Sequence, residues 1–114
     1  MTQVYKIVSR AEWDAAVRAG AFEGAAIDFT DGYIHLSTAA QAQETARRHF
    51  AGQAGLVLVR LDTDRLGAAL KWEPSRGGDL FPHFYGPLDP ALAEAVAAIP
   101  LGADGVPALG ELIA

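Results

Sequence analysis

Residues 31–37, Asp-Gly-Tyr-Ile-His-Leu-Ser, place a turn signal, a short strand and a histidine–serine pair within seven positions. Asp-Gly is typical of a tight turn, and in the extended backbone that follows, side chains alternate between two faces. This alternation predicts that Tyr33, His35 and Ser37 share one face, with the two aliphatic residues between them on the other. The strand should therefore present a polar site on one side and apolar core on the other.

A second stretch, Phe-Pro-His-Phe-Tyr-Gly-Pro at residues 81–87, repeats this design. Extended backbone would place Phe81, His83 and Tyr85 on one face. Two of the three histidines of the chain therefore lie in the middle of predicted strands, between aromatic or hydroxyl neighbours.

Composition limits the classes of function. With 114 residues, of which 51% are hydrophobic, the chain is predicted to be one domain over residues 1–114, too short for two. The net charge of −5 and the scattered Lys and Arg residues argue against a nucleic-acid partner. The absence of cysteine excludes disulfides, thiolate metal sites and cysteine nucleophiles. No signal peptide and no apolar run of membrane-spanning length is recognised, so we expect a cytoplasmic protein without a membrane partner.

Two capping boxes predict helices in the first half of the chain. Ser9 and Glu12 indicate a helix over 10–19, which Gly20 should end in the left-handed conformation. Thr38 and Gln41 have the same spacing and indicate a second helix over 39–51. The predicted buried stripe of the first helix is Trp13, Ala16 and Val17.

The region between the helices is predicted to be a loop. Residues 21–30 show no clean period, and the loop should fold back so that Phe22, Ile27 and Phe29 cover something apolar, thereby roofing the site. The second helix would begin beside His35 and Ser37, and a helix N-terminus attracts anions such as phosphate.

The second half of the chain is predicted to be mostly strand. Residues 55–62 are apolar on both faces and should form a central strand. A turn, a strand over 69–73 and a flexible Gly-rich loop over 74–79 follow. Residues 89–99 are ambiguous, because their alanine-rich composition and Asp-Pro start favour a helix.

Four stretches carry a resemblance to a known family: residues 31–37, residues 81–87, Lys-Trp-Glu at 71–73 and Tyr-Lys-Ile at 5–7. With these stretches the chain resembles the DUF952 family of small bacterial proteins, for which no activity is established. The resemblance implies a short turn near 90–93 and then a strand through about Ile99. It also implies a fold similar to that of ADP-ribosyltransferases. The predicted architecture is a single α+β domain, with a mixed, strongly bent sheet or two abutting small sheets, flanked by two helices from the N-terminal half.

The same resemblance suggests a function. The step from His35 to Ser37 is similar to the His-x-Ser/Thr strand motif with which ADP-ribosyltransferases and RNA 2′-phosphotransferases hold the nicotinamide-side ribose. The leading hypothesis is a pocket between the two histidine strands for a small ribose- or phosphate-containing ligand, with NAD or a related nucleotide as the expected class. If the ligand reacts, we expect glycosidic or phosphoryl transfer. No cofactor is required by the sequence.

The candidate residues each have a plainer structural interpretation. His35 and His83 are the candidate catalytic residues, with Glu73 as the nearest carboxylate in sequence, but a strand histidine can also simply occupy the core. The candidate ligand contacts are Tyr33, Ser37, Tyr85 and Arg76, where Arg76 would be a mobile phosphate contact or a solvated loop charge. Trp72 is predicted to be core, and His49 to be structural or on the surface.

Two alternatives remain open at this stage. One is a non-catalytic module of the same fold that binds a metabolite or a protein, favoured by the lack of a recognisable catalytic glutamate. The other is a metal site formed by His35, His83 and Glu73, a two-histidine, one-carboxylate set.

Overall fold

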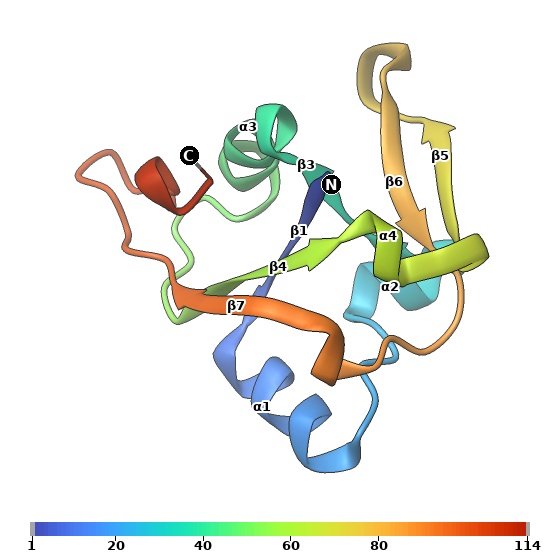
Figure 1. The fold of residues 1–114 in the computed structure, drawn as a ribbon. Helices are drawn as coiled ribbons and strands as arrows, with labels where there is room; N and C mark the ends of the chain where they lie inside the picture. Colours follow the sequence, from blue (N-terminus) through green and yellow to red (C-terminus); the bar gives the residue numbers. More distant parts are fainter. Residues whose placement is uncertain (1, 114) are drawn as a thin grey trace.

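The apolar segment at residues 56–62 forms the centre of a four-stranded sheet. The computed structural model describes residues 2–113, apart from the side chain of Arg76. Its strand order is β3-β1-β4-β7, and all neighbours are antiparallel (Figure 1). The bounds are β1 Gln3–Ser9, β3 Ser37–Thr38, β4 Leu56–Asp62 and β7 Ala93–Ala98. The prediction of a central strand is confirmed, since β4 pairs on both edges and buries six of its seven residues.

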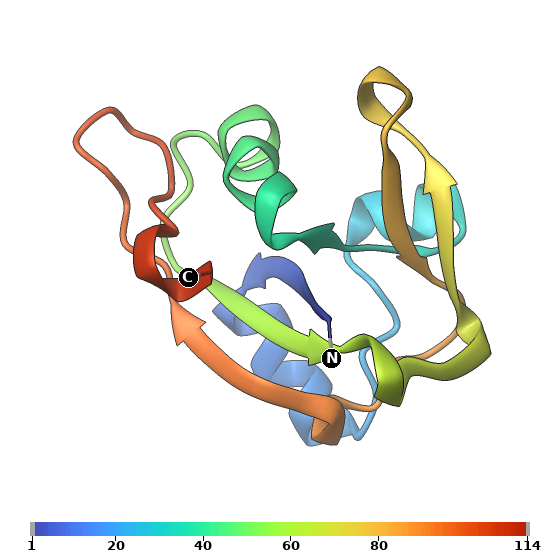
Figure 2. The same ribbon diagram turned by 45° about the horizontal axis from the view of Figure 1, so that its top comes forward.

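A second, three-stranded sheet stands beside the first, and its β5–β6 hairpin projects away from it (Figure 2). The strand order is β2-β6-β5, with bounds β2 Ile34–His35, β5 Leu70–Pro74 and β6 Leu80–Phe84. This sheet is also antiparallel, so the prediction of a mixed sheet is wrong. The reason is connection length: five residues join β5 to β6, whereas a parallel pair needs a crossover of a dozen or more. The alternative of two small sheets is confirmed.

The histidine–serine stretch is divided between the two sheets. His35 in β2 pairs with His83 in β6, whereas Ser37 in β3 pairs with Tyr5 in β1. Leu36 lies between them, buried, and its N–H donates to the carbonyl of Pro82 at 3.1 Å. The prediction of one continuous strand is therefore wrong, because the chain changes partner strand at Leu36. The alternation survives, since Ile34 and Leu36 are both core.

Helices cover both faces of the four-stranded sheet. Helix α1 (Arg10–Ala19) packs Trp13 against the core on one face, and α3 (Ala39–His49) packs Ala42 and Ala46 against the other (Figure 1). Both N-caps form as predicted: the Ser9 hydroxyl accepts from the Glu12 N–H, and Thr38 and Gln41 cap each other. Gly20 ends α1 with φ 83°, but Val17 is exposed, so its predicted place in the buried stripe is wrong.

A short helix, α2 (Ala26–Asp31), replaces the predicted loop. The Asp28 carboxylate accepts from the Ala25 N–H at its start, and Gly32, with φ 89°, ends it. Phe22 is buried and its backbone pairs with Leu88, but Ile27 and Phe29 are exposed. The prediction of a loop is therefore wrong, and the predicted apolar roof holds only for Ile27, which lines a cavity described below, whereas Phe29 does not.

The remaining segments connect the sheets and close the C-terminal side. They are α4 (Thr63–Leu66) and the 3₁₀ turns η1 (Gly67–Ala69), η2 (Arg76–Gly78), η3 (Pro90–Leu92) and η4 (Gly110–Ile113). The turn and strand implied by the family resemblance near residues 90–99 are confirmed. Trp72 is 42% exposed, so its predicted core position is wrong. Within residues 2–113 the fold is α+β, with two antiparallel sheets and four α-helices, and no helix there could span a membrane.

Candidate functional site

A cavity of about 500 Å³ lies where β1, the two short histidine-region strands, α3 and β6 approach one another. Three of the predicted site residues, His35, Ser37 and His83, line it together. The other lining residues are Tyr5, Lys6, Ile7, Ile27, Asp31, Leu36, Thr45, His49, Phe50, Ser75 and Phe81. We refer to this cavity as the cleft. It combines apolar walls with a few polar groups, the usual chemistry of a small-molecule site.

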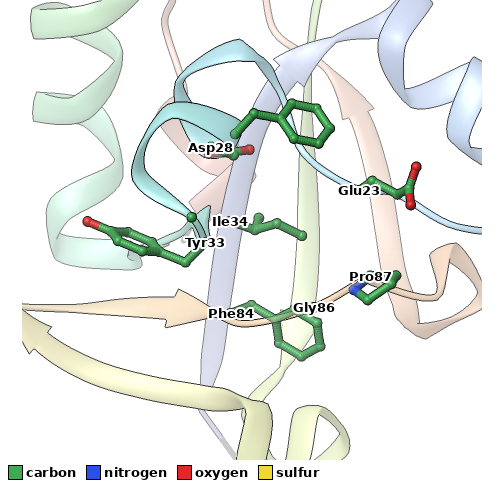
Figure 3. Close-up of a pocket in the computed structure, with 9 residues that line it drawn as sticks. Glu23, Asp28, Tyr33, Ile34, Phe84, Gly86 and Pro87 are labelled. Carbon is green, nitrogen blue, oxygen red and sulfur yellow. The ribbon is translucent and has the colours of Figure 1, made fainter.

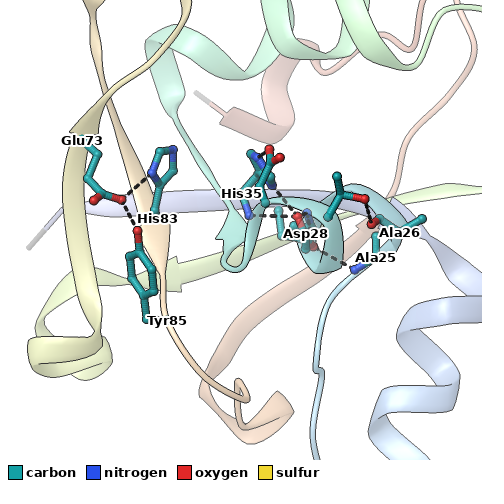
Figure 4. A network of polar contacts seen from close by, with 10 residues as sticks. Ala25, Ala26, Asp28, His35, Glu73, His83 and Tyr85 are labelled. Atoms are coloured by element: carbon teal, nitrogen blue, oxygen red, sulfur yellow. Dashed lines mark hydrogen bonds and ion pairs between the residues drawn. The ribbon is translucent and has the colours of Figure 1, made fainter.

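His35 is held by two carboxylates of α2. Its Nδ1 lies 2.6 Å from Asp28 Oδ1 and its Nε2 lies 2.9 Å from Asp31 Oδ2 (Figure 4). The backbone N–H of His35 also donates to Asp28 Oδ1, at 3.0 Å. A carboxylate accepts, so both ring contacts are hydrogen bonds only when the imidazole carries both N–H protons. The ring therefore ties α2 to the second sheet.

Asp28 is the buried anchor of this arrangement. Its Oδ2 lies 2.9 Å from Lys6 Nζ, and both side chains are almost fully buried. Burial alone would raise the pKa of Asp28, but the hydrogen bond from His35, the charge of Lys6 and two backbone N–H groups hold it well below its usual range. Burial lowers the pKa of Lys6, and the charge of Asp28 opposes that change. The ion pair thus joins the first sheet, through β1, to α2.

Neither member of this pair was predicted from the sequence to belong to the site. Asp28 lies in a segment without periodicity, and no local pattern marks it as buried. Lys6 carries the one available signal, because it interrupts an apolar run between Val4 and Val8 that is buried on both faces. A lysine inside such a strand requires a buried partner.

Glu73, His83 and Tyr85 form a second polar unit on the β5–β6 hairpin. Glu73 Oε1 accepts from His83 Nδ1 at 2.8 Å and from the Tyr85 hydroxyl at 2.7 Å (Figure 4). Because the carboxylate can only accept, Nδ1 carries a proton. His83 is 3% exposed, and its Nε2 has no hydrogen-bond partner among residues 2–113. The Nε2 atom itself is not fully buried, so the unit presents an accessible imidazole nitrogen without a protein partner at the wall of the cleft.

The aromatic rings of the predicted site pack into one cluster. The Tyr33 ring stacks on the His83 ring, with centroids 4.0 Å apart, and lies 4.6 Å from the His35 ring. Tyr85 approaches the other side of the cluster, with its ring centroid 5.5 Å from that of Tyr33. Burial, followed by the charges of Asp31, Glu73 and Asp28, raises the pKa of Tyr33. The structure thus brings together the two histidines, the two tyrosines and Glu73.

Ser37 reaches the cleft from the other sheet. Thr45 donates its hydroxyl proton to the Gln41 carbonyl at 3.1 Å, so the Ser37 hydroxyl, 3.0 Å from Thr45 Oγ1, is the donor of that contact. Ser37 therefore keeps free lone pairs but no free proton. It can accept a hydrogen bond from a ligand.

The remaining residues weighed for the site are His49 and Arg76. His49, predicted to be structural or on the surface, is exposed and lines the cleft. The side chain of Arg76 lies outside the described residues, so its phosphate contact stays a prediction. No group of three His, Asp or Glu residues in the described part of the chain is arranged to hold a metal ion, and both ring nitrogens of His35 already face carboxylates. The geometry gives the metal hypothesis no support.

The Tyr85 phenol should report on the carboxylate beside it. Its hydrogen bond to Glu73, with burial and the carboxylate charge, raises the pKa of Tyr85 to about 12. In Glu73→Gln the hydrogen-bonded charge is removed, and we expect this pKa to fall towards about 10. Titration of the tyrosine Cζ resonances by ¹³C NMR measures it. Glu94→Gln, the same substitution on β7, should leave Tyr85 unchanged, and a wild-type Tyr85 pKa near 10 would contradict the geometry.

Two of three comparisons with known proteins gave matches, one with a family and one with solved structures. The family described as "Protein of unknown function (DUF952)" matches residues 7–98. The crystal structure of protein CC0527 from Caulobacter crescentus, a structural genomics target, has 55% sequence identity and a TM-score of 0.96, and the alignment covers 98% of each chain. The solution NMR structure of CC0527 has 56% identity and a TM-score of 0.88, over 98% of this chain and 97% of that chain. The search of curated proteins found no match.

Proposed function

The chain belongs to the DUF952 family, whose description assigns no function. We propose from the geometry of the cleft that the cleft binds a small molecule of the NAD class, which contains ribose or phosphate. The observation that carries this proposal is the unpartnered Nε2 of His83. This atom has no partner among the described residues and is reachable from the cleft, so it is free to accept a hydrogen bond from a ligand. A ligand hydroxyl that donates to Nε2 would supply it.

The second acceptor of the cleft favours a ligand with more than one hydroxyl. Ser37 has free lone pairs and no free proton, so it also needs a donor from the ligand. A ribose diol offers two donors at neighbouring carbons. A volume of about 500 Å³ lies within the usual range for small-molecule sites. The similarity of the His35–Ser37 step to the ribose-holding motif of ADP-ribosyltransferases supports the NAD class, and an ADP-ribosyltransferase-like fold is part of this proposal.

The cleft also has the parts of a general base. Glu73 holds the Nδ1–H of His83, which leaves Nε2 as the basic atom. If the bound hydroxyl is a nucleophile, Nε2 takes its proton as the oxygen bonds to the anomeric carbon or to phosphorus. The leaving group then departs with the electron pair of the bond that it had to that atom. Asp31 and Glu73 would then be the carboxylates available to stabilise positive charge on the reacting group, and each already contacts a histidine.

That pairing favours the second candidate, a metabolite-binding module without turnover. Asp28, Asp31 and Glu73 each accept from a side chain of the protein. A carboxylate that stabilised an oxocarbenium-like ribose would have to leave such a partner. Incubation with NAD followed by ¹H NMR for released nicotinamide separates the two candidates: binding without release supports the module, and release supports the enzyme.

Replacing His83 by phenylalanine should weaken binding while keeping the ring stacked on Tyr33. We expect a loss of about 1–3 kcal/mol, the cost of leaving one ligand hydroxyl without its partner. NMR titrations against NAD, ADP-ribose, nucleoside monophosphates and ribose phosphates measure it through the amides of residues 33–41. Trp72→Phe, on the opposite face of the same hairpin, is the control and should bind normally. If none of these compounds shifts the wild-type amides, the ribose-ligand proposal is wrong.

A further inference from the structure

A second recess, of about 240 Å³, shares no lining residue with the cleft. Figure 3 shows Ile34 at its centre, with Asp28 and Phe84 on either side and Glu23 and Pro87 grouped to the right. The Tyr33 ring points away from Glu23 and Pro87, so this residue meets the recess near its backbone (Figure 3). The remaining lining residues are Phe29, Gly32 and Gly86. Neither the DUF952 description nor the proposal for the cleft assigns this recess a role.

The walls of the recess are apolar and aromatic. Ile34 and Phe84 are core residues that expose only small parts of their side chains. Phe29 is 65% exposed, the largest exposed fraction among the large apolar side chains of residues 2–113. A phenylalanine left in water at the edge of a recess is unfavourable by itself, and a bound group that covers its ring would recover part of that free energy.

The charge of the recess is negative. Its lining includes two carboxylates and no Lys, Arg or His. Asp28 is paired with Lys6 and hydrogen-bonded to His35, but Glu23 is exposed and has no ion pair or hydrogen bond with any other described residue. The chain as a whole carries a net charge of −5.

We propose that this recess binds the methylated ammonium group of a small organic cation, such as a trimethylammonium head group. Aromatic faces attract such cations through their quadrupole, and the methyl groups suit the apolar wall formed by Ile34 and Pro87. Glu23 supplies the opposite charge at the rim. A bare metal ion fits poorly because Glu23 is the one unpaired carboxylate among the lining residues, and an anion is repelled.

Choline, titrated by ¹H–¹⁵N NMR, is the probe. We expect saturable shifts of the amides of Phe29, Gly32 and Gly86, with little change at Ser37 and Thr45 in the cleft. The neutral isostere 3,3-dimethylbutan-1-ol tests the charge, and it should bind more weakly. Glu23→Gln should raise the Kd about fivefold, as expected for one partly exposed ion pair, and Phe29→Leu should raise it by a similar factor.

Two matched substitutions control for general effects. Glu111→Gln removes an exposed carboxylate in the C-terminal turn, and Trp72→Leu removes an exposed aromatic ring on the β5–β6 hairpin, so neither should change choline binding. Equal binding of choline and its neutral isostere, an unchanged Kd in Glu23→Gln, or no shift at Phe29 would each overturn the proposal. Because the cleft amides are followed in the same spectra, failure here is distinguishable from failure of the ribose-ligand proposal.

Discussion

Replacing Asp28 with asparagine will lower the free energy of unfolding by about 3–5 kcal/mol, the range for removing one partner of a buried ion pair. The cause is the ammonium of Lys6, which is 4% exposed and would stay in the interior without a countercharge. The imidazole of His35 would lose its shortest contact, at 2.6 Å, in the same variant. Urea denaturation followed by circular dichroism measures the change.

The controls isolate the buried charge. Asp31→Asn removes the other carboxylate at His35, but that side chain is 39% exposed, so its effect should stay below about 1 kcal/mol. The double variant Lys6→Met, Asp28→Leu removes both charges and should recover much of the stability lost in Asp28→Asn. Equal effects of Asp28→Asn and Asp31→Asn would show that the Lys6 pair contributes little.

The same carboxylate gives a pH dependence with a definite sign. The folded protein holds the pKa of Asp28 well below its usual range, whereas the unfolded chain has a value of about 3.9. The stabilisation by Asp28 is therefore fully present above the unfolded pKa and decreases as the pH falls towards the folded pKa. The difference in unfolding free energy between wild type and Asp28→Asn should thus shrink below about pH 4. A constant difference down to lower pH would contradict the low pKa.

Leu58→Ala should be the second strongly destabilising change, by about 2–4 kcal/mol, through lost burial and an internal cavity. Leu58 lies in β4 between β1 and β7, and it is 3% exposed. It packs in the core cluster that includes Tyr5, Ala42 and Leu109, so the gap would open between the sheet and α3. Chemical denaturation measures the loss.

Two substitutions provide the comparison for Leu58. Leu80→Ala removes the same methyl groups from a side chain that is 53% exposed and should change stability by less than about 0.5 kcal/mol. Ser75→Ala, in the loop between β5 and β6, should behave similarly, since the Ser75 side chain is exposed. An unchanged denaturation midpoint in Leu58→Ala would show that β4 is not the central strand.

The elements that could be predicted from the sequence are those whose signals are local. The helix over 10–19 is correct at both ends because Ser9, Glu12 and Gly20 satisfy backbone groups within a few residues of themselves. The second helix begins as predicted at Ala39 for the same reason, and it ends at His49 rather than residue 51. The central strand was predictable because a segment that is apolar on both faces must be covered on both. Family resemblance, not periodicity, gave the strand at 93–98.

The candidate site was predictable only in its residue types. Tyr33, His35, Glu73, His83 and Tyr85 do meet, because the alternation along each strand places the two histidines on one face. The pairing of His35 with His83 joins residues that are 48 positions apart, and no local pattern encodes that register. Nε2 of His83 has no protein partner because Glu73 contacts the other ring nitrogen, Nδ1, and only the tertiary structure shows this.

The sequence by itself determined the two helices with capping boxes, the central strand and the identity of the two histidine stretches, since each depends on neighbours along the chain. Tertiary structure alone decided that the chain changes sheets at Leu36, that residues 26–31 form a helix, and that Asp28 meets Lys6. Each of these depends on where a distant segment satisfies a buried polar group. A carboxylate in a segment without periodicity looks like a solvated surface charge until the ammonium 22 residues away is placed beside it.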